Sequence, residues 1–66
     1  MELYLNGELR HFDHDLDIRQ LVDQLGLSGQ RFAVEVNRQI VPKSRHAGHA
    51  LQNGDRIEII QAMGGG

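Results

Sequence analysis

One segment of this chain has the periodicity of an amphipathic helix, residues 17–26, with the sequence DIRQLVDQLG. Ile18, Leu21, Val22 and Leu25 are spaced i, i+3, i+4 and i+7, which places them on one side of a helix. A single apolar stripe must be covered by another layer, and the remaining segments are strand-like. We therefore expect one helix to pack on one sheet.

The ends of this helix are also indicated by the sequence. Asp17 is suited to cap the first turn, and Gln20 three residues later completes the pattern of a capping box. Gly26 follows the last apolar residue, at the position where a left-handed C-cap is expected.

A hairpin is predicted for residues 2–12, because the Asn-Gly pair at 6–7 is a strong turn signal. A two-residue loop would place Leu5 opposite the charged Glu8. A three-residue loop gives a largely apolar inner face, and for this reason we predict the longer loop. The predicted cross-strand pairs are Leu5 with Leu9 and Leu3 with His11.

Three further strands are predicted in the rest of the chain. The segments are Phe32–Val36, Ile40-Val41 and 56–61, with a turn at 37–39 and a stop at Pro42. In the last strand, Ile57 and Ile59 are expected to face the core and Ile60 to face outward. Residues 43–51 are expected to form a loop with a helical turn, anchored by Leu51.

The predicted fold class is therefore α+β, a mixed sheet of four to five strands with one main helix packed on one face. The chain has 66 residues and no cysteine, so it is near the lower size limit for a domain without disulfides or metals. We expect one domain at 1–61 and a flexible C-terminal tail at 62–66.

Composition argues against several classes of partner. The net charge is −2 and the charges are interspersed, without the basic stripe of a nucleic-acid binder. No apolar run approaches the roughly 20 residues needed to span a bilayer, and the N-terminus does not have the pattern of a signal peptide. We expect a cytoplasmic protein that binds neither nucleic acid nor membrane.

The sequence predicts no metal site. Asp13, Asp15 and Asp17 resemble the start of a calcium-binding loop, but Ile18 and Gln24 stand where that loop needs glycine and glutamate. The four histidines form two pairs far apart in sequence, at 11 and 14 and at 46 and 49. We interpret them as solvated loop residues, because a zinc site needs three or four converging ligands.

No catalytic residue is predicted either. Ser28 and Ser44 are the only serines, and no base is aligned with either of them in the sequence. A catalytic cleft is also improbable in so small a domain.

The last three residues, Gly64, Gly65 and Gly66, have no side chains that could pack or react. Taken alone, such a tail is either a frayed end or a segment whose chemistry lies in its backbone and carboxylate. Residues 62–66 could extend roughly 16–18 Å from the last strand. Because glycine has no Cβ, the tail could pass through a narrow channel in a partner and present the carboxylate there.

The whole chain resembles the sulfur carrier proteins of bacterial thiamine biosynthesis, the ThiS family, which have the ubiquitin-like β-grasp fold. The resemblance is carried by the short N-terminal hairpin, the helix, and the segments VEVNRQIVPK, LQNGDRIEII and the terminal GGG.

The resemblance implies a carrier and not an enzyme. An E1-like adenylyltransferase, ThiF, would use Mg-ATP to adenylate Gly66, and a persulfide made by a cysteine desulfurase would convert it to a thiocarboxylate. Thiazole synthase, ThiG, would then take the sulfur into the thiazole ring. Gly65 and Gly64 would thread the partner's channel, Met63 and Ala62 would enter its mouth, and Ile60 would be a docking contact.

Two alternatives remain open from the sequence. One is a sulfur carrier for molybdopterin synthesis, which shares the fold and the tail. The other is a non-covalent β-grasp binding module whose glycines are incidental. Removal of Gly65 and Gly66 would distinguish a sulfur carrier from a binding module, because only a carrier depends on these two residues.

Overall fold

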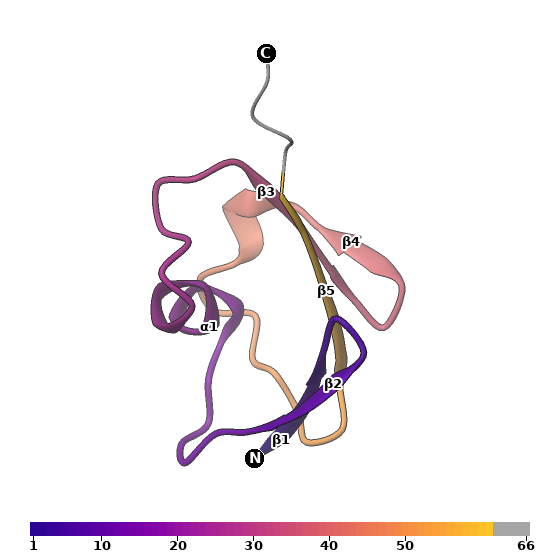
Figure 1. The fold of residues 1–66 in the computed structure, drawn as a ribbon. Helices are drawn as coiled ribbons and strands as arrows, with labels where there is room; N and C mark the ends of the chain where they lie inside the picture. The colour runs from indigo at the N-terminus through magenta and orange to yellow at the C-terminus, as the bar shows by residue number, and fades with distance from the viewer. Residues whose placement is uncertain (62–66) are drawn as a thin grey trace.

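The amphipathic segment forms helix α1, Ile18–Gln24, in the computed structural model, which describes residues 1–61. Ile18, Leu21 and Val22 are buried, as the periodicity predicts, and Leu25 packs partly buried at the end of the helix. The helix lies across one face of a sheet (Figure 1). The predicted two-layer α+β arrangement is confirmed.

Both predicted caps of α1 are present. Asp17 accepts a hydrogen bond from the Gln20 N–H at 2.8 Å, and the Gln20 side chain accepts one from the Asp17 N–H at 2.9 Å. Gly26 has φ +73°, and the next N–H, of Leu27, donates to the Val22 carbonyl at 3.1 Å. These bonds satisfy backbone groups that a helix end would otherwise leave unpaired.

Asp17 also ties the helix to a distant loop. Its second carboxylate oxygen accepts a hydrogen bond from the Gly48 N–H at 3.0 Å, and Asp17 forms an isolated β-bridge with Ala50. The N–H of Gly48, and after it that of Gln20, holds the pKa of Asp17 below its ordinary value because both stabilise the carboxylate.

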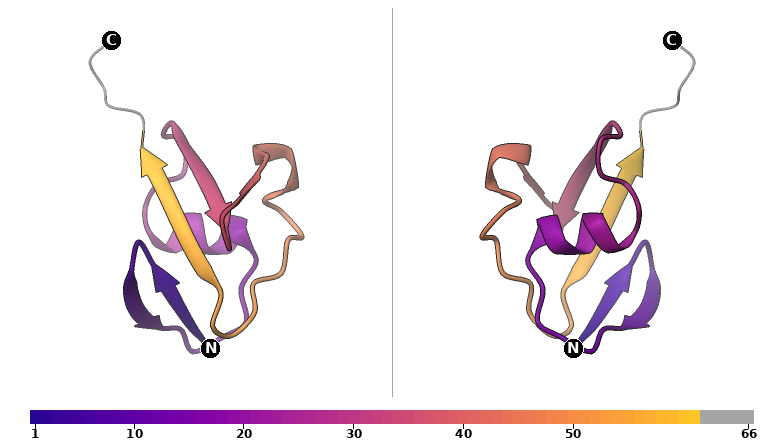
Figure 2. Two further views of the ribbon diagram at one scale, coloured as in Figure 1. Left: turned by 90° about the vertical axis from the view of Figure 1, so that its right-hand side faces the viewer. Right: turned by 90° about the vertical axis from the view of Figure 1, so that its left-hand side faces the viewer.

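The sheet has five strands in the order β2-β1-β5-β3-β4 (Figure 2). β1 and β5 are parallel, and all other neighbours are antiparallel. β5 is the central strand, between β1 and β3. The strands are β1 (Glu2–Leu5), β2 (Glu8–His11), β3 (Phe32–Val36), β4 (Gln39–Val41) and β5 (Arg56–Gln61).

The predicted register of the first hairpin is wrong. The turn has two residues, Asn6 and Gly7, whose φ angles of 50° and 83° are both positive, as a type I′ turn requires. All of β2 is exposed at the edge of the sheet, so an apolar inner face is not needed there. The observed pairs include Leu5 with Glu8, Tyr4 with Leu9 and Leu3 with Arg10.

The second hairpin is also tighter than predicted. β4 begins at Gln39, opposite Val36, so that the turn consists of Asn37 and Arg38 alone. Their φ angles are 51° and 69°. Pro42 ends β4 as predicted.

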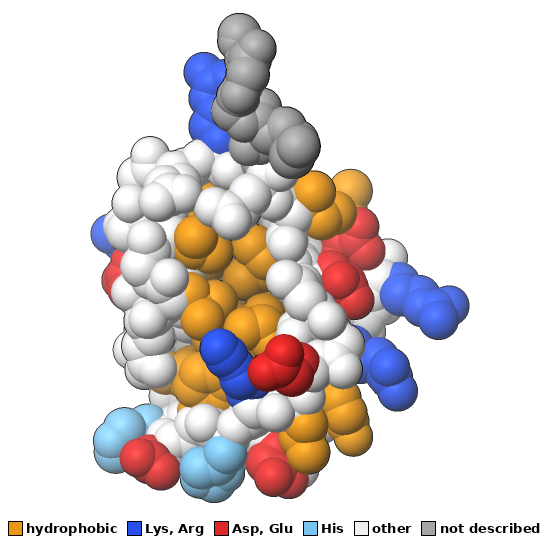
Figure 3. Space-filling view, viewed as in Figure 1, with side chains coloured by type: hydrophobic (Ala, Val, Ile, Leu, Met, Phe, Trp, Pro, Cys, Tyr) orange, Lys and Arg blue, Asp and Glu red, His pale blue; other side chains and the backbone are white. Residues whose placement is uncertain are grey.

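The core lies between α1 and the sheet, and Figure 3 shows apolar side chains gathered there. Ile57 is buried and Ile59 packs against the core, as predicted, while Leu51 anchors the loop after the 3-10 helix η1 (Lys43–Arg45). No helix of residues 1–61 is long and apolar enough to cross a membrane. The buried residues are Leu3, Leu5, Leu16, Ile18, Leu21, Val22, Val34, Val36, Val41, Leu51 and Ile57.

One loop histidine is not solvated as predicted. His46 is only 6% exposed, and its Nε2 lies 3.0 Å from the carbonyl oxygen of Val41. Its ring stacks on Phe32, with centroids 6.0 Å apart and planes 19° apart. The turn of η1 carries the side chain back toward the sheet, where one backbone hydrogen bond offsets the cost of burying a polar ring. Within residues 1–61, no three histidine, aspartate or glutamate side chains could together hold a metal ion.

Candidate functional site

The site predicted from the sequence begins at the end of β5, because the glycine tail follows this strand. Gln61 is paired with Phe32 of β3, and its side-chain amide N–H donates to the side-chain oxygen Oε1 of Gln30 at 2.9 Å. Ile60 is paired with Ala33. The point at which the chain leaves the described residues is therefore held by the sheet (Figure 1).

A side chain of the first hairpin holds the other side of β5. The ladder between β1 and β5 ends where the Asn6 N–H donates to the Ile57 carbonyl at 2.8 Å. Beyond that bond the chain turns away, and the Asn6 side-chain oxygen accepts from the Ile59 N–H at 2.8 Å. Asn6 thus extends the parallel ladder by one bond, toward the tail.

The outer face of the sheet carries exposed apolar residues. Ile60 is 56% exposed, as predicted from the alternation of β5, and Ile40 is 71% exposed. The sequence prediction did not single out Ile40, although the burial of its neighbour Val41 implies that Ile40 faces outward. Both isoleucines lie on the face away from α1.

Charged side chains separate these apolar positions on the outer face. Glu58 of β5 lies opposite Glu35 of β3, and Glu35 lies opposite Ile40. Farther along β5, the Arg56 guanidinium lies 5.1 Å from the centre of the Tyr4 ring. In Figure 3, acidic, basic and apolar side chains share this side of the sheet. The outer face of the sheet therefore offers small apolar contacts with charges around them.

The residues predicted to carry and thread the reactive group lie outside the described residues. They are Ala62, Met63, Gly64, Gly65 and Gly66. Of the predicted site, the structure describes β5, which comes directly before these residues, and the docking candidate Ile60 within it. It also adds Asn6 and Gln30 beside the end of β5, and Ile40 on the same outer face as Ile60.

The sheet order, the single helix on one face and the central last strand define a β-grasp protein of the ubiquitin-like class. A family model for the ThiS family matches residues 3–66. The chain therefore belongs to the ThiS family.

Individual relatives agree with this assignment. The sulfur carrier protein ThiS of Escherichia coli is 30% identical over 66 residues, which cover all of both chains. A crystal structure of a thiamine biosynthesis protein (ThiS) from Geobacter metallireducens has a TM-score of 0.85 at 26% identity, again over all of both chains.

Another group of relatives is much longer. A thiazole synthase of Paramagnetospirillum magneticum is 42% identical, and one of Magnetococcus marinus is 32% identical, each over all 66 residues of this chain. The chain spans about a fifth (20%) of the length of these two proteins.

Proposed function

We propose that Gly66 carries sulfur as a C-terminal thiocarboxylate for formation of the thiamine thiazole ring. The observation that supports this most directly is the position of the three glycines, five residues or fewer beyond the central strand of a ThiS-family β-grasp domain. A fixed strand followed by residues without Cβ suits delivery of a carboxylate into a partner's active site.

The chemistry proceeds in three steps, with catalysis supplied by partners. A carboxylate oxygen of Gly66 attacks the α-phosphorus of Mg-bound ATP in an E1-like adenylyltransferase of the ThiF type, and pyrophosphate leaves. The terminal sulfur of a persulfide, made by a cysteine desulfurase, attacks the acyl-adenylate carbon and displaces AMP. A thiol then attacks the other sulfur of the acyl disulfide, which releases the thiocarboxylate and leaves a disulfide.

We further propose thiazole synthase, ThiG, as the protein that accepts the sulfur. The two long relatives named thiazole synthase, each matching all of this chain, support this choice. The ThiS match also favours thiamine over molybdopterin as the pathway. A cytoplasmic location agrees with a carrier that requires ATP and contains no cysteine.

The first test is the intact mass of the protein after incubation with Mg-ATP, the adenylyltransferase, cysteine and a desulfurase. We expect a gain equal to the exchange of one oxygen for one sulfur. Omission of ATP or deletion of Gly66 should abolish the gain. An unchanged mass with active enzymes would contradict the carrier function and favour the binding module.

The second test concerns docking through Ile60. We expect Ile60→Asp to raise the KM of the adenylyltransferase for the carrier about tenfold, because a central apolar contact contributes more than about 1 kcal/mol. Leu9→Asp is the matched control, since Leu9 is 53% exposed but lies on the edge strand β2. Equal effects of the two variants on KM would show that Ile60 is not part of the interface with the adenylyltransferase.

A further inference from the structure

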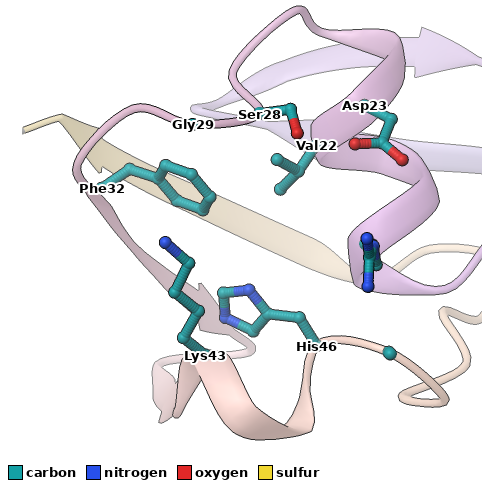
Figure 4. A pocket seen from close by; sticks show the side chains of 9 residues that line it. Val22, Asp23, Ser28, Gly29, Phe32, Lys43 and His46 are labelled. Atoms are coloured by element: carbon teal, nitrogen blue, oxygen red, sulfur yellow. The ribbon is translucent and has the colours of Figure 1, made fainter.

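A cavity of about 250 Å³ lies between α1, the loop before β3 and the 3-10 helix η1. Val22 and the half-buried Phe32 supply apolar walls, and Arg19, Asp23, Lys43 and His46 supply polar ones. In Figure 4, Phe32, Lys43 and His46 lie on one side of the cavity and Val22 and Asp23 on the other. The sulfur-carrier chemistry uses none of these residues.

His46 presents a polar atom to this cavity although the residue as a whole is buried. Its Nε2 faces the Val41 carbonyl, a group that can only accept, so Nε2 carries the hydrogen. The other ring nitrogen, Nδ1, has no hydrogen-bond partner within residues 1–61 and is not sealed from solvent. In Figure 4 this nitrogen is directed toward α1, across the cavity. A buried ring with one free edge of this kind is suited to contact a ligand.

The charges around the cavity favour an anion. Lys43, the only lysine of the chain, extends over the Phe32 ring with Nζ 5.6 Å from its centre, and Arg19 approaches from α1. Asp23 is the one carboxylate among the described residues that line the cavity. The charges of Arg19, Lys43 and Asp23 together leave a balance of one positive charge.

We propose that this cavity binds a small organic anion with a planar apolar body, such as an aromatic carboxylate or phosphate ester. The apolar body lies against Val22 and Phe32, and the anionic group lies toward Arg19, Lys43 and His46. The volume is slightly below the range typical of drug-sized ligands, which limits the ligand to one ring and its substituents. This proposal does not depend on the sulfur-carrier function.

The test is a titration of the 66-residue protein, followed by amide chemical shifts in two-dimensional NMR. The probe is benzenesulfonate, which is an anion at neutral pH, and benzenesulfonamide is its neutral counterpart. We expect benzenesulfonate to shift amides of residues 19–23, 28–32 and 43–47, with an affinity at least tenfold higher than that of the sulfonamide. Equal affinities, or shifts confined to other residues, would overturn the proposal.

Charge-removing variants sharpen this test. We expect Lys43→Gln and Arg19→Gln each to weaken binding about threefold to fivefold, the range for a partly exposed charge pair. Arg45→Gln is the control, because Arg45 lies on η1 but does not line the cavity, and it should leave the affinity unchanged. Equal weakening by all three would show a general effect of net charge and overturn the site.

Discussion

The two hairpins of this sheet have the same turn geometry but different sequences. Asn6-Gly7 joins β1 to β2, and Asn37-Arg38 joins β3 to β4, each with two consecutive residues at positive φ. Glycine adopts this conformation without strain, whereas arginine does so at a cost of roughly 1–2 kcal/mol. The second turn therefore needs support that the first can do without.

That support comes from the central strand. The Asn37 side chain accepts from the Arg56 N–H at 3.0 Å and donates to Asp55 at 3.0 Å, while its own N–H donates to the Arg56 carbonyl at 2.7 Å. In the first hairpin, Asn6 makes one side-chain bond to β5, at Ile59. The two asparagines hold β5 near its start and near its end. A locally unfavourable turn can thus be maintained by contacts distant in sequence.

The largest effect is expected from Asn37→Ala. This change removes two side-chain hydrogen bonds and places alanine at a φ angle that asparagine tolerates better, so we expect a loss of about 2 kcal/mol in the free energy of unfolding. Urea denaturation followed by circular dichroism measures it. A loss smaller than that of Asn6→Ala would contradict the greater dependence of the second turn on β5.

A smaller loss is expected from Asn6→Ala, about 1–1.5 kcal/mol, since one side-chain bond disappears. The change should also raise the hydrogen-exchange rate of the Ile59 amide, because Asn6 is its acceptor. Normal protection of this amide in the variant would show that the bond does not hold the end of β5.

The smallest effect is expected from Arg38→Gly, a gain of roughly 0.5 kcal/mol. The substitution relieves backbone strain at φ 69°, which stabilises the folded state. This gain in free energy is slightly larger than the stabilisation of the unfolded chain by the greater flexibility of glycine. Gly7→Ala is the reciprocal control and should cost about 1 kcal/mol. A Cβ at Gly7 would meet no atom within 4 Å, so no steric clash adds to the backbone strain and to the change in unfolded-chain flexibility. Thermal unfolding of both variants at one pH provides the comparison. A destabilised Arg38→Gly protein would mean that the arginine side chain contributes more than its strain costs.

Features set by neighbouring residues could be predicted from the sequence. The caps of α1 depend on Asp17, Gln20 and Gly26, which lie within ten residues of one another, and each was predicted correctly. The outward position of Ile60 follows from alternation along one strand.

Features set by distant contacts could not be predicted in this way. The register of the first hairpin was misjudged because apolar pairing was weighted above the turn preference of Asn-Gly, at a strand that proved to be an exposed edge. The burial of His46 depends on Val41 and Phe32 together, and the role of Asn6 depends on Ile59, 53 residues away. The tail residues 62–66 remain a prediction from the sequence, as they lie outside the described residues.

The parallel pairing of β1 with β5 has a consequence for synthesis of the protein. β5 is central, yet it is the last strand of the sheet to be made, and β1 and β3 are joined only through it. A nascent chain that lacks Arg56–Gln61 has no strand to join its two hairpins, and it leaves the apolar residues of α1 and of the hairpins without a complete sheet to cover them. The sheet can therefore close only after this strand has emerged from the ribosome, and until then the chain is open to chaperones and proteases.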